Sequence, residues 1–128
     1  ITIDSFLNKY SNPLSIADDE ALKNVANYID DHYATSISQD TLEKISTMSG
    51  TKLKKLFKQK YQCTITEYTQ RRRMNMAELL LLNSTLKIQD IAEAVGYSSH
   101  SKFSTCFKKY KGFYPKDIKK YAKNNLSD

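Results

Sequence analysis

The chain has 128 residues, of which 40% are hydrophobic, and a formal net charge of +6 at pH 7. This length suits one domain or two very small subdomains, and three Gly with two Pro leave little material for β-hairpins. The composition therefore argues against a sheet-rich fold and favours an all-α one, while the positive charge favours a polyanionic partner.

The charge is unevenly distributed along the chain. Residues 1–49 hold three Lys against eight Asp and Glu, a net charge of −5, whereas residues 50–128 hold 17 Lys and Arg against six acids, a net charge of +11. We expect the basic part to present a face to phosphates and the acidic segment to present one that avoids them.

Residues that bind metals or form disulfides are few. Cys63 and Cys106 lie far apart, and the only His residues are His32 and His100, so neither a metal site nor a disulfide framework is expected. We expect no cofactor. The most apolar run, Leu79–Leu82, is far too short to span a membrane, and no signal peptide is recognisable. A cytoplasmic protein without membrane contact is therefore expected.

About seven helices are predicted from apolar residues that recur at spacings of three and four. In chain order they are Ala17 to about Tyr33, a helix capped by Ser38, Thr51–Tyr61, Thr64 to about Asn83, Lys87–Val95, Ser98–Lys111, and Pro115 to about Lys123. Residues 1–16 are expected to be a linker or the truncated tail of an absent N-terminal domain, and residues 124–128 a C-terminal tail.

The fourth helix is predicted to be the longest. Thr64 and Glu67 have the spacing of a capping box at its start, and its twenty residues give a rod of roughly 30 Å. Its inward side is expected to carry five residues, which are Ile65, Tyr68, Met76, Leu79 and Leu80.

The segment Ser98–Lys111 has two unlike faces. Phe103 and Phe107 share an apolar side with Cys106, and the opposite side is small, polar and basic. That opposite side comprises His100, Ser101, Ser104, Thr105 and Lys108. A short apolar helix pattern that stops at Gly96 precedes the segment, and helix, glycine turn and second helix together form a helix-turn-helix pattern.

The chain contains an internal repeat. A shift of fifty residues superposes Gln39-Asp40 on Gln89-Asp90, Glu43 on Glu93, Ser49 on Ser99, Lys52 on Lys102, Leu53 on Phe103 and Phe57-Lys58 on Phe107-Lys108. Two copies of one supersecondary unit joined by one long helix explain this pattern. Because Ser46 stands opposite Gly96, the first turn, Met48-Ser49-Gly50, is expected to differ by one residue, and the register of the second helix stays open.

Three blocks carry a resemblance to a known family. They are Met48–Lys58, Tyr68…Arg72…Met76-Ala77…Leu80-Leu81, and Ile88…Ile91-Ala92…Val95-Gly96-Tyr97 continued by Phe103…Phe107-Lys108…Gly112…Pro115. Together they resemble the DNA-binding domain of the AraC/XylS family of bacterial transcription regulators, over about residues 17–121. The chain departs from the family pattern at Glu43, where a small apolar residue is usual, and at Tyr114, where a capping Thr is common.

The resemblance implies an all-α fold with two helix-turn-helix subdomains, residues 17–63 and 85–123, joined by a linker helix at 64–84. Each subdomain would place a recognition helix in one of two successive major-groove segments, and a rod of roughly 30 Å suits one turn of B-DNA, ~34 Å. The base-facing positions it implies are Thr51, Lys54, Lys55, His100, Ser101, Ser104 and Thr105. Lys52, Lys58, Ser99, Lys102 and Lys108 complete the expected DNA-binding set.

Several residues admit a second interpretation. The lysines of the first recognition helix could form a merely solvated face, and His100 could be an ordinary helix-terminal residue. Arg72 is interpreted as a structural ion-pair residue, whereas Arg71 is either a phosphate contact or solvated. Cys106 is interpreted as a packing residue rather than a redox or ligand thiol.

The expected function is sequence-specific binding of double-stranded DNA in bacterial transcription regulation. RNA polymerase stays open as a further partner, and an effector-binding or dimerisation domain is expected to be absent from this sequence. The rival hypothesis is a basic helical protein-interaction module that binds an acidic protein. No catalytic constellation or glycine-rich phosphate loop is recognisable, so no enzyme is expected, and no aromatic platform for single-stranded RNA is evident.

Overall fold

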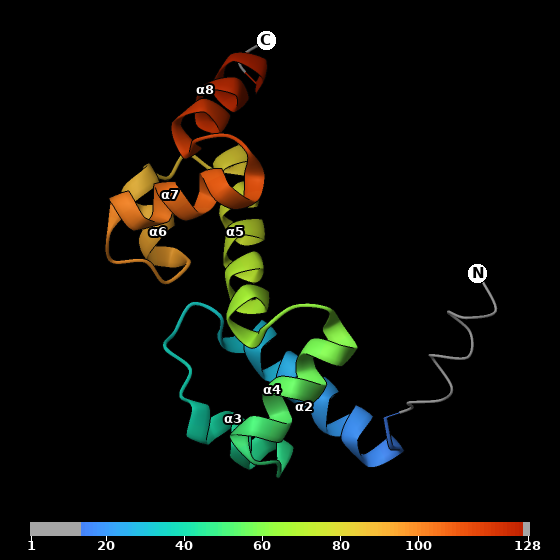
Figure 1. Cartoon of the computed structure of the whole chain (residues 1–128). Coiled ribbons are helices and arrows are strands. Elements are labelled where there is room, and N and C mark those ends of the chain that lie inside the picture. Colours follow the sequence, from blue (N-terminus) through green and yellow to red (C-terminus); the bar gives the residue numbers. More distant parts are fainter. Residues whose placement is uncertain (1–13, 127–128) are drawn as a thin grey trace, which may run out of the picture. The chain divides into compact units, whose positions relative to one another are not determined.

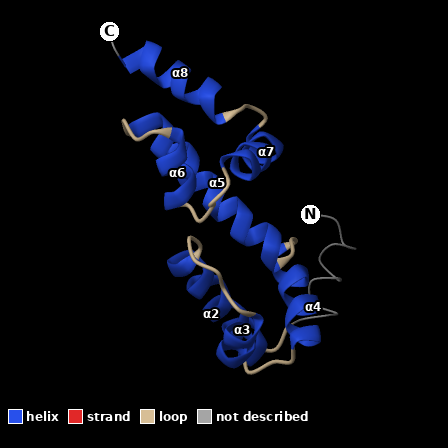
Figure 2. Cartoon of the chain, turned by 90° about the vertical axis from the view of Figure 1, so that its left-hand side faces the viewer, coloured by secondary structure: helices blue, strands red, loops and turns tan. Residues whose placement is uncertain are grey.

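The computed structural model describes residues 14–126, which form seven helices and no strand (Figure 1). The helices are α2 (Ile16–His32), α3 (Gln39–Ser46), α4 (Gly50–Tyr61), α5 (Ile65–Asn83), α6 (Ile88–Ala94), α7 (His100–Lys111) and α8 (Pro115–Leu126). The all-α prediction is confirmed, and Figure 2 shows only helices and loops in this part of the chain. Of the two predicted tails, residues 1–13 and 127–128 lie outside the described residues.

The described chain divides into two compact units. The first comprises the residues up to Tyr28 and Ser38–Thr64, and the second comprises Ile29–Ile37 and the chain from Ile65 onward. Helix α2 therefore begins in the first unit and ends in the second. The whole of α5, predicted as a link, belongs to the second unit.

The core of the first unit is built where the apolar stripes of its helices meet. Leu22 and Val25 of α2 are fully buried, and so is Phe57 of α4, with Leu53 only 1% exposed. The ring of Phe57 lies 4.6 Å, between centroids, from that of Tyr61, whose hydroxyl donates to the Leu22 carbonyl oxygen at 3.4 Å. Helix α4 is therefore held on α2 by one side.

The core of the second unit joins α5, α6 and α7. Its buried residues are Met74, Ala77, Leu81, Ile91, Ala92, Val95, Phe103 and Phe107. Phe103 and Phe107 are fully buried and their rings lie 5.9 Å apart between centroids, which confirms that the apolar side predicted for this helix faces the core. Helix α7 is therefore anchored by one side, as α4 is.

The buried side of α5 differs from the predicted one. Met74, Ala77 and Leu81 are buried, whereas Leu79, expected to face inward, is 53% exposed. The apolar residues of α5 surround much of its C-terminal half, so their spacing alone does not identify the side that α6 and α7 cover.

From the N-cap of the first helix to the N-cap of the second, the two helix-turn-helix units differ by one residue, whereas the turns between the helices have three residues (47–49) and five residues (95–99), where a difference of one was predicted. Helices α3 and α6 follow the N-cap residues Ser38 and Lys87, which lie 49 positions apart, whereas the caps of α4 and α7, Ser49 and Ser99, lie 50 apart. The first helices of the two copies therefore align with a shift of 49, so the predicted pairing of Glu43 with Glu93 is wrong by one position. In the corrected register, Glu43 stands opposite the buried Ala92.

The turns also use different residues for their left-handed backbone. Thr47 has a φ of 55° in the first turn, and Gly96 has a φ of 98° in the second. The residue Gly50, predicted to lie in the turn, is the first residue of α4, because the Ser49 hydroxyl caps the helix there by accepting from the Lys52 amide at 3.3 Å.

The repeat continues beyond the recognition helices. The C-cap residues that follow α4 and α7, Gln62 and Gly112, both have a left-handed backbone conformation. The following helices, α5 and α8, begin at Ile65 and Pro115, again fifty residues apart. The predicted start of the last helix at Pro115 is confirmed, and this helix extends beyond the expected Lys123 to Leu126. Among the helices described, none is long and apolar enough to cross a membrane.

Candidate nucleic-acid interface

Helices α4 and α7, which were predicted to be the recognition helices, each present a polar face opposite an apolar stripe. Four residues at spacings of i, i+3, i+4 and i+7 share this face, because that spacing aligns side chains along one side of a helix. In α4 they are Thr51, Lys54, Lys55 and Lys58, all exposed. In α7 they are Ser101, Ser104, Thr105 and Lys108, of which Ser104 is half-buried and the others are exposed. The structure thus brings eight predicted residues into two equivalent faces.

The remaining predicted residues flank these faces. His100 is exposed and stands where α4 has Gly50, immediately before the four-residue face. Ser99 is the N-cap of α7, and its hydroxyl oxygen accepts from the Lys102 amide at 3.2 Å. Because that bond occupies the Ser99 oxygen, any DNA contact of Ser99 would share it with the cap.

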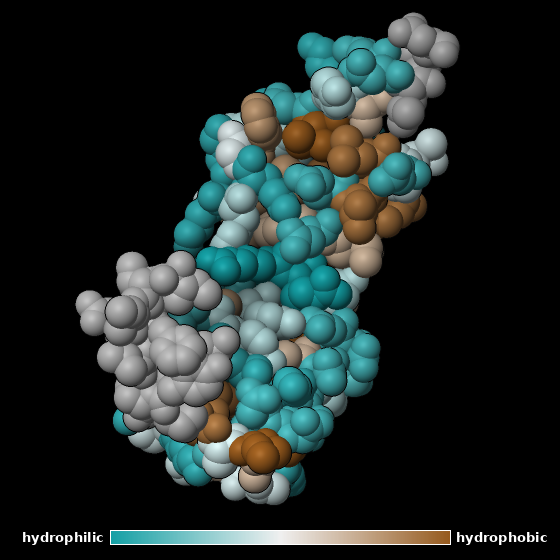
Figure 3. Space-filling model, turned by 90° about the vertical axis from the view of Figure 1, so that its right-hand side faces the viewer, coloured by the Kyte–Doolittle hydropathy of each residue, from teal (hydrophilic) through white to brown (hydrophobic). Residues whose placement is uncertain are grey.

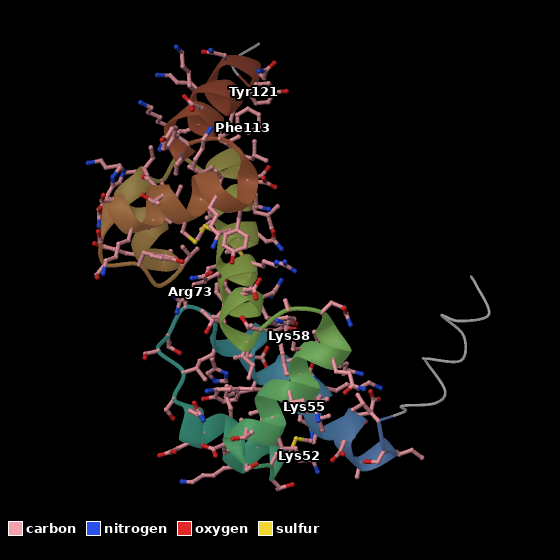
Figure 4. All side chains as sticks on the ribbon, in the orientation of Figure 1. Lys52, Lys55, Lys58, Arg73, Phe113 and Tyr121 are labelled. Carbon is pink, nitrogen blue, oxygen red and sulfur yellow. The ribbon has the colours of Figure 1, made fainter. Side chains whose placement is uncertain are left out.

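The face of α4 is strongly basic. Figure 4 labels Lys52, Lys55 and Lys58 one after another along the helix. Lys52 forms an ion pair with Asp18 of α2, its Nζ lying 3.5 Å from Oδ1. Among the described residues, the ion pairs that involve α4 join α2 carboxylates to Lys52 and Lys60, and none involves Lys55 or Lys58. The carboxylates of α2 therefore leave the charge at the centre of the face available.

Asp19 holds the other end of α4. It accepts a hydrogen bond from Lys60 and forms an i,i+4 ion pair with Lys23, 3.3 Å from Nζ to Oδ2. The bond from Lys60, followed by that from Lys23, lowers the pKa of Asp19 below its ordinary value. A carboxyl group whose pKa is lower in the folded protein stabilises it above the unfolded pKa, and that stabilisation is lost as the pH falls through the folded pKa.

We therefore expect the first unit to lose stability in acid, below about pH 4, partly through Asp19. In the Asp19→Asn variant this contribution is absent, so the difference in unfolding free energy between pH 7 and pH 3 should be smaller than in the wild type. Urea unfolding at both pH values measures it, with Asp31→Asn, an exposed residue of the same helix, as the control. An unchanged pH difference in Asp19→Asn would contradict the expectation.

The polar groups of α7 are occupied by local bonds. Thr105 Oγ1 donates to the Ser101 carbonyl oxygen at 3.0 Å, and Lys108 Nζ donates to the Gly112 carbonyl oxygen at 2.8 Å. Because these acceptors are exposed backbone groups, both side chains can exchange the bonds for an external partner at low cost. The face of α7 is thus less basic than that of α4 and richer in hydroxyl groups.

Two arginines in the middle of α5 contact the end of α2 and the loop that follows it. Arg72 forms an ion pair with Asp30, its Nε lying 3.0 Å from Oδ1, so the predicted structural ion pair is confirmed; the same carboxylate oxygen accepts a hydrogen bond from the Tyr68 hydroxyl at 2.9 Å. Arg71 is exposed. Arg73 contacts two backbone carbonyl oxygens near the end of α2, and sequence reasoning missed it, because backbone acceptors some forty residues away leave no side-chain signal.

Neither cysteine contributes to a metal-binding group in the described part of the chain, where no three His, Cys, Asp or Glu side chains gather as ligands. Cys63 is buried, and Cys106 is half-buried beside Tyr97, whose hydroxyl donates to its Sγ at 3.2 Å. Burial, followed by this hydrogen bond, raises the pKa of Tyr97 to about 12. At neutral pH the Tyr97 hydroxyl therefore keeps its proton and remains a donor to Cys106.

The sequence matches a family model and named proteins. A model described as a helix-turn-helix domain matches residues 42–121. The Msm operon regulatory protein of Streptococcus mutans is 33% identical over 101 residues, which are 79% of this chain and 36% of that protein. The transcriptional activator RhaS of Escherichia coli is 32% identical over 92 residues, 72% of this chain and 33% of that protein. The chain thus spans about a third of the length of these curated relatives.

Solved structures share the fold. The C-terminal domain of AraT, a response regulator from Geobacillus stearothermophilus, is similar with a TM-score of 0.75 and 28% identity, over 86% of this chain and 88% of that one. The DNA-binding domain of AdpA, solved in complex with a target DNA, is similar in fold with a TM-score of 0.76 at 18% identity, over 82% of this chain and 95% of that one. The matching model covers more than half of the chain, and the paired helix-turn-helix units agree with it, so the chain belongs to the AraC/XylS family of helix-turn-helix transcription regulators.

Proposed function

We propose that the chain binds double-stranded DNA in a sequence-specific manner, as part of a bacterial transcription regulator, with α4 and α7 each entering a major groove. The observation that carries the proposal is the repeated four-residue face, Thr51 to Lys58 and Ser101 to Lys108, which is exposed except for the half-buried Ser104 and lies opposite a buried apolar stripe in both units. A helix anchored by one side and polar on the other is the element that reads base edges in helix-turn-helix proteins.

The two faces are suited to different tasks. The lysines of α4 are point charges without the bidentate fork of arginine, so they serve phosphates at least as well as guanine. The hydroxyl groups of Ser101, Ser104 and Thr105 can donate to or accept from base edges. We infer that α4 supplies more of the affinity and that α7 supplies more of the discrimination between sequences.

The salt dependence of binding tests this proposal. The logarithm of the association constant should fall linearly with the logarithm of the salt concentration, with a slope of about −0.9 for each phosphate neutralised. Fluorescence anisotropy with a labelled duplex, measured from low to physiological salt, gives this slope. A slope near zero would overturn DNA binding through the lysines.

Single substitutions separate base reading from phosphate binding. Lys55→Ala and Ser104→Ala should each change the base preference at one of two separate blocks of the bound site, because each residue lies on a different recognition helix. Binding-site selection with each variant measures this change. Uniform weakening over all sequences by both variants would sink the assignment of these residues to base contacts.

One surface favours the rival function, binding of an acidic protein. Figure 3 shows apolar side chains gathered on a face of the second unit. Phe113 and Tyr121 are 59% and 62% exposed, and Lys108 Nζ lies 5.2 Å from the centroid of the nearby Tyr114 ring. Aromatic residues beside lysines suit an acidic and partly apolar partner. The double variant Phe113→Ser/Tyr121→Ser tests this rival. If it binds duplex DNA as tightly as the wild type does, and if the wild-type affinity falls with salt as expected above, DNA is favoured over an acidic protein.

The further partners of the protein are also proposals. The name of RhaS as a transcriptional activator supports RNA polymerase as a partner of the DNA-bound protein. Because the matched residues make up only 36% and 33% of these two curated relatives, we propose that effector binding and dimerisation belong to residues outside this sequence.

A further inference from the structure

We propose that Arg73 is a positioning residue for the recognition helix α7, and that it acts by holding the loop after α2 against the turn that precedes α7. The inference rests on the proposed DNA binding and adds to it a determinant of specificity that does not itself face the DNA. All the contacts that support it lie within the second unit.

Arg73 joins three segments of that unit. From α5, its Nε donates to the Tyr33 carbonyl oxygen at 2.6 Å and its Nη2 donates to the Thr35 carbonyl oxygen at 3.2 Å. Its guanidinium carbon lies 5.4 Å from the centroid of the Tyr97 ring, a cation–π distance. Two fixed donors and a flat stacking surface on one side chain are properties of arginine that lysine lacks.

The turn before α7 fits closely against the same loop. A Cβ atom added to Gly96 would lie 2.8 Å from the Ala34 carbonyl oxygen and 3.1 Å from Arg73 Cζ. Gly96 also has a φ of 98°, which L side chains rarely adopt. The loop carbonyls and the guanidinium thus form a surface on which the backbone of the turn rests.

Tyr97 connects this surface to α7. Its hydroxyl donates to Cys106 Sγ at 3.2 Å, and its ring lies 5.8 Å, between centroids, from that of Phe103. Both of these residues are on the inward side of α7. A shift of Tyr97 would therefore be transmitted to the anchored side of the helix and would move the opposite face, which carries Ser101 and Thr105.

The first unit holds its corresponding turn by local bonds. There the buried Ser46 hydroxyl donates to the Glu43 carbonyl oxygen at 3.2 Å and accepts from the Met48 amide at 3.2 Å. The turn before α4 is therefore fixed within itself, whereas the turn before α7 also rests on Arg73. A change at Arg73 should consequently affect reading by α7 and spare reading by α4.

The test is base discrimination measured separately at each half of the bound site. The half whose preference changes in Ser104→Ala is assigned to α7, and the half that changes in Lys55→Ala to α4. For wild type, Arg73→Lys and the matched control Arg71→Lys, affinities are measured for the selected duplex and for duplexes with one altered base pair in either half. The ratio of the two affinities does not depend on the fraction of protein that is folded, so simple destabilisation leaves it unchanged.

We expect Arg73→Lys to lower discrimination about tenfold in the α7 half, which corresponds to about 1.4 kcal/mol. Discrimination in the α4 half should stay within about twofold of the wild-type value. Arg71→Lys should leave both halves within about twofold. Tyr97→Phe keeps the aromatic ring beside Arg73 and removes the hydrogen bond to Cys106. It should also lower discrimination in the α7 half only, by less than Arg73→Lys does. This variant serves as the test if Arg73→Lys does not fold.

If the wild-type protein discriminates between sequences in both halves, either of two results would overturn this inference and leave the proposed function standing. One is full discrimination in Arg73→Lys, and the other is an equal loss in the two halves. A wild-type protein without discrimination in either half would instead overturn the proposed function itself, and this inference with it.

Discussion

Replacement of Lys54, Lys55 and Lys58 together by alanine is expected to weaken binding to duplex DNA roughly a hundredfold at low salt, at on the order of 1 kcal/mol for each contact of a lysine with DNA, whether to a base or to a phosphate. The salt slope should become smaller by about 2 to 3, because each phosphate that loses its neutralising lysine removes about 0.9. These lysines are exposed, and none of them forms an ion pair with a carboxylate among the described residues. Anisotropy titrations at several salt concentrations measure both quantities.

A control with the same change in charge separates position from net charge. The variant Lys44→Ala/Lys120→Ala/Lys123→Ala also removes three exposed lysines, from α3 and α8, outside the two recognition faces. It should change the salt slope by less than one contact. An equal loss of affinity in the two triple variants would show that overall charge, and not the α4 face, drives binding.

Phe107→Ala is expected to destabilise the second unit by about 3–5 kcal/mol. The Phe107 side chain is fully buried among Met74, Ile91 and Phe103, so its removal would lose apolar burial and leave a cavity beneath α7. This cost is a large part of the total stability of an ordinary small domain, about 5–15 kcal/mol. Urea unfolding followed by helical circular dichroism gives the free energy change.

Phe113→Ala provides the matched control. Phe113 has the same side chain but is 59% exposed, so its loss should change the unfolding free energy by no more than about 0.5 kcal/mol. If Phe107→Ala were as mild as Phe113→Ala, the assignment of Phe107 to the core would be wrong. A folded but weakened Phe107→Ala should also lose DNA affinity, because α7 would no longer be anchored.

Local sequence signals predicted much of the fold. Ser38 caps α3 by accepting from the Thr41 amide at 3.2 Å, and Pro115 begins α8, because both signals act within a single helical turn. The apolar pairs of the recognition helices likewise revealed their buried sides, since each stripe is narrow. The two polar faces follow directly from those stripes.

Features that depend on distant segments could not be predicted in this way. The buried side of α5 is selected by α6 and α7, which cover Ala77 and leave Leu79 exposed. The shift of 49 between α3 and α6 arises because the second helix-turn-helix unit is one residue longer from N-cap to N-cap, a difference that a fixed repeat of fifty residues does not reveal. Arg73 acts on backbone carbonyl oxygens, and these are invisible in a pattern of side chains.

Selection of bound sequences from a random pool of duplex DNA tests the central proposal most directly. If α4 and α7 both read bases, the selected sites should contain two conserved blocks, one lost in Lys55→Ala and the other in Ser104→Ala. Selection at near-physiological salt limits the contribution of nonspecific phosphate binding. A selected pool without any conserved block, or with a single block affected by both variants, would contradict reading by two recognition helices.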